Sequence, residues 1–174
     1  MAYESVTGNL SFKVLPQEIR KRFNGSMSYN GVDANDKWIY KKVLATHSAL
    51  TVLSSNDDYL TVTNNAADPA AAGDNIRFII IKHTGYLTNN ESSASNYGVL
   101  ISFDNTNPAW NTTASAGTPL FLAPGDTMAM KIPNTQLSEF KVITCTISGN
   151  IPSGTTSSGQ DALIEIAAIV DDGA

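Results

Sequence analysis

The 174-residue chain has one cysteine, two histidines and little charge. Cys145 has no partner for an internal disulfide, so no disulfide framework holds this fold together. Only 16% of the residues are charged, below the roughly 25% typical of soluble domains. His47 and His83 do not have the spacing of a zinc site. The surface should therefore be covered mainly by neutral polar side chains, and we expect no metal and no cofactor.

Sequence patterns of common enzymes are also missing. The chain has no Gly-x-Ser-x-Gly elbow and no Gly-Lys-Ser/Thr phosphate loop. Cys145 lies inside an apolar strand pattern, which is typical of a buried, inert thiol. No basic start followed by an apolar run opens the chain, and no segment approaches the ~20 apolar residues of a membrane span. We predict a non-enzymatic protein with no catalytic residues and no membrane partner.

Short runs with a two-residue apolar period fill most of the chain. Such runs, rich in β-branched residues and separated by Ser, Thr, Asn, Gly and Pro, are typical of strands with one buried face. Around ten strands with no long helix predict an all-β fold, specifically a β-sandwich of the jelly-roll type with a short N-terminal extension. The expected strands are 10–15, 38–45, 49–53, 59–62, 76–83, 97–103, 119–122, 127–132, 140–147 and 163–170.

The first 24 residues look least like the rest, and we expect residues 1–24 to form an arm ahead of a single domain at 25–174. Pro16 ends the first alternating run, and residues 17–23 have the character of one or two helical turns. Asn24-Gly25 and Asn30-Gly31 are pairs that favour tight hairpin turns. We therefore expect the chain to fold back on itself at these pairs.

Charge is distributed unevenly along the chain. Residues 1–42 carry a net charge of +3, and the remainder carries −8. An acidic body lacks the basic stripe expected of a nucleic-acid-binding protein. A basic end suits docking on an acidic partner, and a solvated helical turn is the alternative interpretation. The candidate docking residues are Arg20, Lys21, Arg22, Lys41 and Lys42.

One turn can be predicted in detail. Pro124 presets the φ angle that a type II turn requires at its second position, and Gly125 supplies the positive φ of the third. Apolar alternation on both sides makes this a turn between two strands.

The segments 102–106 (SFDNT) and 117–127 (GTPLFLAPGDT) resemble virion structural proteins of tailed bacteriophages. The chain is similar in particular to head decoration (cement) proteins, and also to small β-sandwich domains of tail and neck proteins, over residues 76–170. The resemblance implies a trimeric, non-enzymatic protein that binds the major capsid protein on the outside of an icosahedral shell. It also implies a protein that is made in the host cytoplasm and is located in the virion, on the capsid surface. An uncharged flank at 114–118 is one candidate for the contact between copies.

Aromatic residues in or beside loops support a second interpretation. Trp110, Tyr97 and Tyr86 are candidates for stacking on a glycan, as in a carbohydrate-binding or host-adsorption module. If Trp110 lies open beside Asp104, this interpretation gains weight. Oxygen-rich clusters such as 56–58 lack the spacing of a dedicated calcium loop, so solvated turns are expected there.

Overall fold

The computed structural model describes residues 5–13, 22–30, 36–53, 71–88, 91–104, 108 and 119–171. The protein is all-β, as predicted, and the described residues include a single helical turn, η1, at Leu137–Glu139. The strands are β1 (Ser5–Lys13), β2 (Arg22–Asn30), β3 (Asp36–Ala45), β4 (Leu50–Thr51), β5 (Asn75–His83), β6 (Gly98–Ser102), β7 (Leu120–Leu122), β8 (Thr127–Gln136), β9 (Lys141–Ser148), β10 (Ile151–Thr155) and β11 (Ala162–Asp171).

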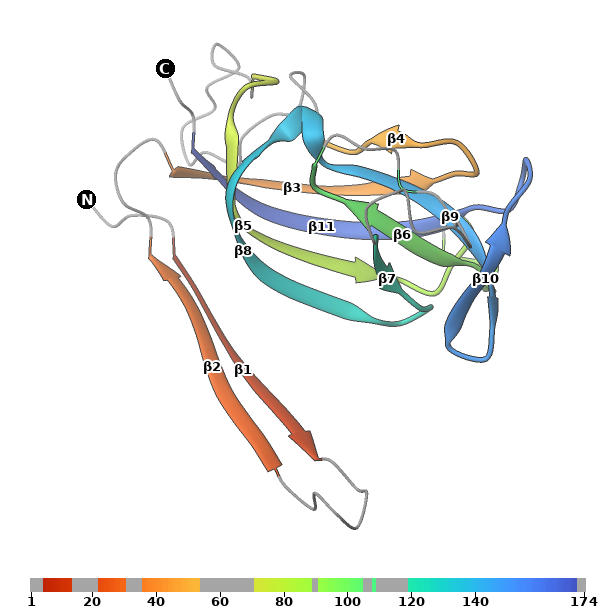
Figure 1. Ribbon diagram of the computed structural model, residues 1–174, viewed down its shortest axis with the longest axis horizontal. Helices are drawn as coiled ribbons and strands as arrows, with labels where there is room; N and C mark the ends of the chain where they lie inside the picture. Colours follow the sequence, from red (N-terminus) through yellow and green to blue (C-terminus); the bar gives the residue numbers. More distant parts are fainter. Residues whose placement is uncertain are drawn as a thin grey trace.

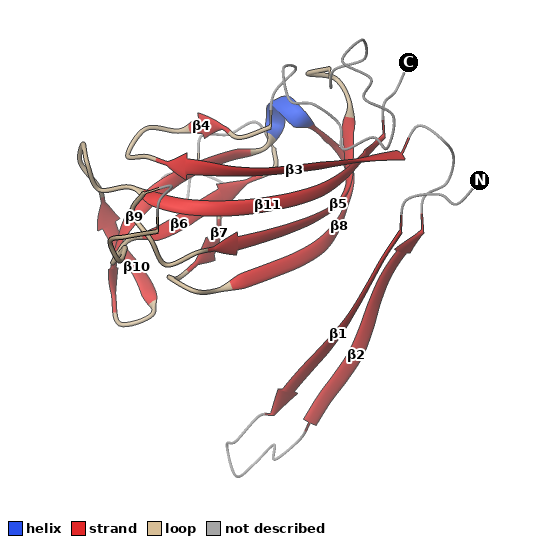
Figure 2. Ribbon diagram, turned by 180° about the vertical axis from the view of Figure 1, so that it is seen from behind, coloured by secondary structure: helices blue, strands red, loops and turns tan. Residues whose placement is uncertain are grey.

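The strands form three antiparallel sheets (Figure 1). Strands β1 and β2 make a hairpin that projects from the rest of the molecule. A four-stranded sheet has the order β3-β11-β5-β8. A five-stranded sheet has the order β10-β9-β6-β7, with β4 also paired to β9. The view from behind in Figure 2 shows the same arrangement, with the hairpin on one side of a two-sheet body.

The two larger sheets share one hydrophobic core. Alternate residues of β11 face inward. They pair with inward-facing residues of the neighbouring strands β3 and β5; Ile166, for example, pairs with Ile81 of β5. Val99, Ile101 and Val142 supply the opposite side from the second sheet. Residues of β5 and β11 on the outer face of the four-stranded sheet are buried as well. Phe78 is only 2% exposed, and Ile169 is fully buried. The outer face of the four-stranded sheet is therefore covered in part.

The predicted turn before β8 is confirmed. Gly125 has φ 88°, which a glycine adopts without strain. The Asp126 N–H donates to the Ala123 carbonyl at 3.0 Å, and the Ala123 N–H donates to the Asp126 carboxylate at 2.9 Å. The aspartate thus stabilises the turn from its last position.

The prediction of a turn at Asn24-Gly25 and of helical turns up to residue 23 is wrong where the structure describes these residues. At the second pair, Asn30 ends β2 and Gly31 lies outside the described residues, so that turn stays a prediction. Asn24 and Gly25 lie inside β2, where they pair with Ser11 and Leu10. Arg22 and Phe23 are already in the same strand. The hairpin's connection therefore falls at 14–21, outside the described residues, and β2 continues past residue 24, where the arm was expected to end. The expected strand at 59–62 also lies outside the described residues, and β10 was not predicted.

His83 joins three parts of the fold. Its Nε2 donates to the Tyr97 carbonyl at 2.8 Å, and its Nδ1 accepts from the Gly85 N–H at 3.0 Å. Its backbone also bonds to the 123–126 turn, through Asp126 and Gly125. The side chain is fully buried, and burial lowers the pKa of His83 below its ordinary value of 6.5 against the opposing effects of the Tyr97 bond and Asp126. His83 is thus a satisfied, neutral structural histidine.

The neutrality of His83 predicts a loss of stability in mild acid. As pH falls through 6.5, the unfolded chain takes up a proton that the folded chain resists, so the free energy of unfolding decreases with a slope of at most about 1.4 kcal/mol per pH unit. Above pH 7.5 this contribution is constant. Urea unfolding at pH 7.5 and 5.5 should show a larger loss for the wild type than for His83→Gln. His47→Gln, at an exposed position, should behave as the wild type. Equal losses in the wild type and His83→Gln would rule the mechanism out.

Candidate docking surface

The β1–β2 hairpin is amphipathic in its sequence. Both strands alternate, and the antiparallel register brings like residues together. One series of paired positions is apolar or glycine: Val6 with Tyr29, Gly8 with Met27, Leu10 with Gly25, and Phe12 with Phe23. The other series is polar or basic: Ser5 with Asn30, Thr7 with Ser28, Asn9 with Ser26, Ser11 with Asn24, and Lys13 with Arg22.

Tyr29, near the end of β2, connects the hairpin to the two larger sheets through two contacts. Its ring lies 6.3 Å from the ring of Phe78 on β5, between centroids. Its hydroxyl donates to the Asp36 carboxylate at the start of β3, at 3.0 Å. Burial, together with this hydrogen bond, raises the pKa of Tyr29 to about 12, so the hydroxyl remains a donor at physiological pH. An apolar contact and a charge-assisted hydrogen bond thus hold the hairpin beside the four-stranded sheet.

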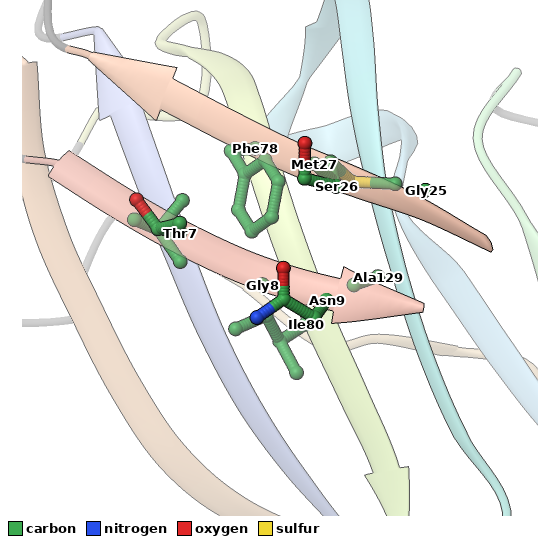
Figure 3. Close-up of a pocket in the computed structure, with 10 residues that line it drawn as sticks. Thr7, Gly8, Asn9, Gly25, Ser26, Met27, Phe78, Ile80 and Ala129 are labelled. Carbon is green, nitrogen blue, oxygen red and sulfur yellow. The ribbon is translucent and has the colours of Figure 1, made fainter. Parts of the chain in front are cut away.

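An apolar groove of about 240 Å³ lies between the hairpin and the outer face of this sheet. Phe78, Ile80 and Ala129 form its floor on β5 and β8 (Figure 3). The hairpin side consists of Val6, Thr7, Gly8, Asn9, Gly25, Ser26 and Met27. Two of the lining residues, Gly8 and Gly25, have no side chain. A Cβ built on Gly25 would meet no heavy atom within 4 Å, and one on Gly8 would meet only the Met27 carbonyl at 4.0 Å.

The far end of the hairpin is basic. Lys13 ends β1 opposite Arg22 at the start of β2, and this end lies away from the two sheets (Figures 1 and 2). Residues 13–22 include four basic residues and one acidic residue, a net charge of +3. Of the predicted docking residues, Arg22 belongs to this end, whereas Arg20 and Lys21 lie outside the described residues.

Lys41 and Lys42 occupy a different place, on β3 in the body. The Lys42 Nζ forms an ion pair with Glu91 Oε1 at 2.6 Å, which raises the pKa of Lys42 and lowers that of Glu91. Lys41 lies on the same face of β3 as Ile39 and Val43, which is the face toward the core. The structure does not bring these two lysines to the basic end of the hairpin.

Of the candidate glycan-stacking residues, Tyr86 and Tyr97 are half-buried, and Trp110 lies outside the described residues. The Tyr86 carbonyl accepts the Leu163 N–H at 2.8 Å, and Tyr86 forms an isolated β-bridge with Ala94. The Tyr97 carbonyl is the acceptor for His83. Both tyrosine backbones are therefore fixed against the body. The flank at 114–118 also lies outside the described residues.

Reactive and metal-ligating groups give no second candidate site in the described part of the chain. Cys145 is fully buried as predicted, and burial raises the pKa of its thiol to about 11, which keeps it protonated. The described residues contain no group of three His, Cys, Asp or Glu side chains that could hold a metal ion. Among the same residues, no helix has the length and apolar character needed to cross a membrane.

The amphipathic hairpin and the groove were not predicted, although the sequence contains signals for both. Strict alternation covers 5–13 and 22–30, which indicates two strands with one apolar face. The unbroken apolar run 78–81 indicates a strand covered on both faces. Only the folded structure shows that the hairpin covers part of the outer face of β5.

Comparisons of this chain with models of protein families, with curated proteins and with solved structures found no match. What the protein does is therefore inferred from its own residues and geometry.

Proposed function

We propose that this protein is a non-enzymatic virion structural protein that binds the outer surface of a phage capsid and stabilises it. The observation that carries the proposal is a two-sheet β body with a hairpin whose basic end extends away from it. Such an arrangement supplies a rigid module and a separate attachment element. The major capsid protein is the partner, and the capsid surface is the location.

The strand order supports a jelly-roll body. Let the eight strands β3 to β9 and β11 be numbered 1 to 8 along the chain. The four-stranded sheet then has the order 1-8-3-6, and the five-stranded sheet contains strands 2, 7, 4 and 5. This order results when a long antiparallel pair of chain segments wraps into two sheets, the pattern of two Greek keys in a jelly roll. Strand β10 extends the connection from β9 to β11. Viral capsid proteins use this fold, although a shared fold alone does not establish a function.

The hairpin's polar series supports its role in attachment. Hydroxyl and amide side chains at Thr7, Asn9 and Ser28 are exposed, and the series ends in the pair Lys13–Arg22. A ribbon of this kind can make hydrogen bonds and ion pairs to an acidic, hydrated protein surface. Each exposed ion pair contributes about 0.2–1 kcal/mol, so attachment depends on several pairs and on several linked copies. A homotrimer supplies three such ends to one shell.

Heating capsids with and without the protein tests the stabilising function. Capsids that lack the protein should release their DNA at a lower temperature than capsids incubated with a saturating amount, measured by the fluorescence of a DNA-binding dye. Albumin at equal mass controls for crowding. Identical release profiles with and without the protein would contradict the proposal, and specific binding to an array of glycans would support the carbohydrate-binding alternative instead.

A further inference from the structure

We propose that four residues at the base of the hairpin form a latch that fixes the direction of the hairpin relative to the two larger sheets. The latch takes one side chain from each of four strands: Tyr29 of β2, Asp36 of β3, Arg77 of β5 and Asp171 of β11. Arg77 is its positioning residue, because it acts on the hairpin through the two carboxylates. The latch is a property of the chain alone and forms without a capsid.

The latch lies where the chain passes from the hairpin to the body. The Tyr29 hydroxyl donates to the Asp36 carboxylate at 3.0 Å, and the two residues are seven positions apart, near the end of β2 and at the start of β3. Ser11 lies five positions along β1 from Val6, the register partner of Tyr29, which corresponds to about 17 Å of extended strand. A small change of angle at Tyr29 therefore moves the outer part of the hairpin by a larger distance.

Two carboxylates lie opposite each other in the body at this point. Asp36 and Asp171 are register partners in the ladder between β3 and β11. Like charges directly opposite each other in a sheet are destabilising, and Asp36 is only 5% exposed, so its charge is costly unless hydrogen bonds and a cation offset it. Tyr29 supplies one such hydrogen bond. The body is therefore more stable with the hairpin in this position than with the hairpin released.

A β-bulge places Arg77 beside these carboxylates. The register of β5 shifts between Ile76 and Phe78, so Arg77 is an extra residue without a register partner in β11. Bulges of this kind turn a side chain in a new direction. The Arg77 guanidinium forms an ion pair with Asp171, and Phe78 faces outward, where its ring lies 6.3 Å from that of Tyr29 between centroids. The bulge thus prepares both the ionic and the apolar side of the latch.

The charge of Arg77 also acts on the bond between Tyr29 and Asp36. The hydrogen bond to Asp171 is the main cause that raises the pKa of Arg77, and the charges of Tyr29 and Asp36 act in the same direction. The guanidinium is therefore close enough to influence both partners of that bond. Without it, the two opposed carboxylates repel each other, and Asp36 is displaced from the position in which it accepts the Tyr29 hydroxyl.

A distance measured between two spin labels by electron paramagnetic resonance tests the latch on the purified protein. One label is attached at Ser11→Cys on the hairpin, and the other at Ser158→Cys in an exposed turn of the body. The natural Cys145 is fully buried, so it does not compete for the label. We expect a single narrow distribution of distances for the protein with an unaltered latch.

Two substitutions weaken the latch from opposite sides. Tyr29→Phe keeps the ring contact and removes the hydroxyl, whereas Arg77→Gln removes the positive charge. A hydrogen bond to a charged group changes an equilibrium about tenfold or more, so each variant should broaden the distribution or add a second distance. The matched control is Lys82→Gln, which removes another cation at the other end of β5, 3.8 Å from Glu165 of β11. The control should leave the distribution unchanged.

Tyr29→Phe changes no residue of the body, so it tests the latch independently of the stability of the sheets, and circular dichroism checks that each variant is folded. Narrow distributions in both Tyr29→Phe and Arg77→Gln would overturn the latch, as would a broad distribution in the unaltered protein. Broadening by Tyr29→Phe alone, or equal broadening by Lys82→Gln, would overturn the role of Arg77 as the positioning residue. Capsids enter none of these measurements, so their outcome is separate from that of the proposed function.

Discussion

Replacing Arg20, Lys21 and Arg22 with glutamate is expected to remove most of this protein from capsids while leaving its fold intact. Three ion pairs in each of the three copies of the proposed homotrimer, at about 0.2–1 kcal/mol each, sum to about 2–9 kcal/mol. Since 1.4 kcal/mol is a tenfold change in affinity, the expected loss is tenfold or more. Occupancy on capsids, measured by co-sedimentation in 50 and 500 mM salt, should also fall for the wild type at the higher salt concentration.

A charge control on the body isolates the role of these residues. Lys82, Lys131 and Lys141 changed together to glutamate give the same change in net charge on the body, and this variant should attach nearly as the wild type does. Wild-type occupancy of the charge-reversed variant in moderate salt would show that the body makes the contact.

Phe140→Ala is expected to lower the free energy of unfolding by about 3–5 kcal/mol. The Phe140 side chain is fully buried, and its ring stacks on that of Phe103 with centroids 5.1 Å apart and planes at 9°. The substitution removes this stack and leaves a cavity where η1 meets β9. Such a loss is a large part of the 5–15 kcal/mol typical of a folded domain.

Urea unfolding monitored by circular dichroism measures the change. Leu120→Ala is a suitable control because Leu120 is 40% exposed, and it should change the stability by much less. A loss below 1 kcal/mol for Phe140→Ala would mean that the core is not organised around this ring.

The strands of the body could be predicted because each shows its pattern locally. The run at 163–170, for example, became β11 with one further residue at each end. The Asn-Gly pair at 24–25 misled because turn propensity is local, whereas the hairpin's register is set by nine pairs of residues. In the observed register every apolar residue of β1 opposes an apolar residue or glycine of β2, and a turn at 24–25 would break this match.

The candidate site was harder to predict than the fold. A basic cluster at 20–22 is visible in the sequence, but the position of Arg22 at the start of β2 depends on the pairing of β2 with β1. The groove depends on three separate segments, because Met27, Phe78 and Ala129 meet only in the folded chain. For Lys42 the sequence was misleading. Its charge suggested a docking residue, but in the structure Lys42 forms an ion pair with Glu91, 49 positions further along the chain.

Co-sedimentation of the purified wild-type protein with capsids that lack it tests the central proposal most directly. We expect the protein to pellet with the capsids in a saturable manner, with a fixed number of copies per shell, and to remain in the supernatant when capsids are omitted. Protein that stays in the supernatant at every capsid concentration in low salt would contradict the proposal that this chain is a capsid-binding virion protein.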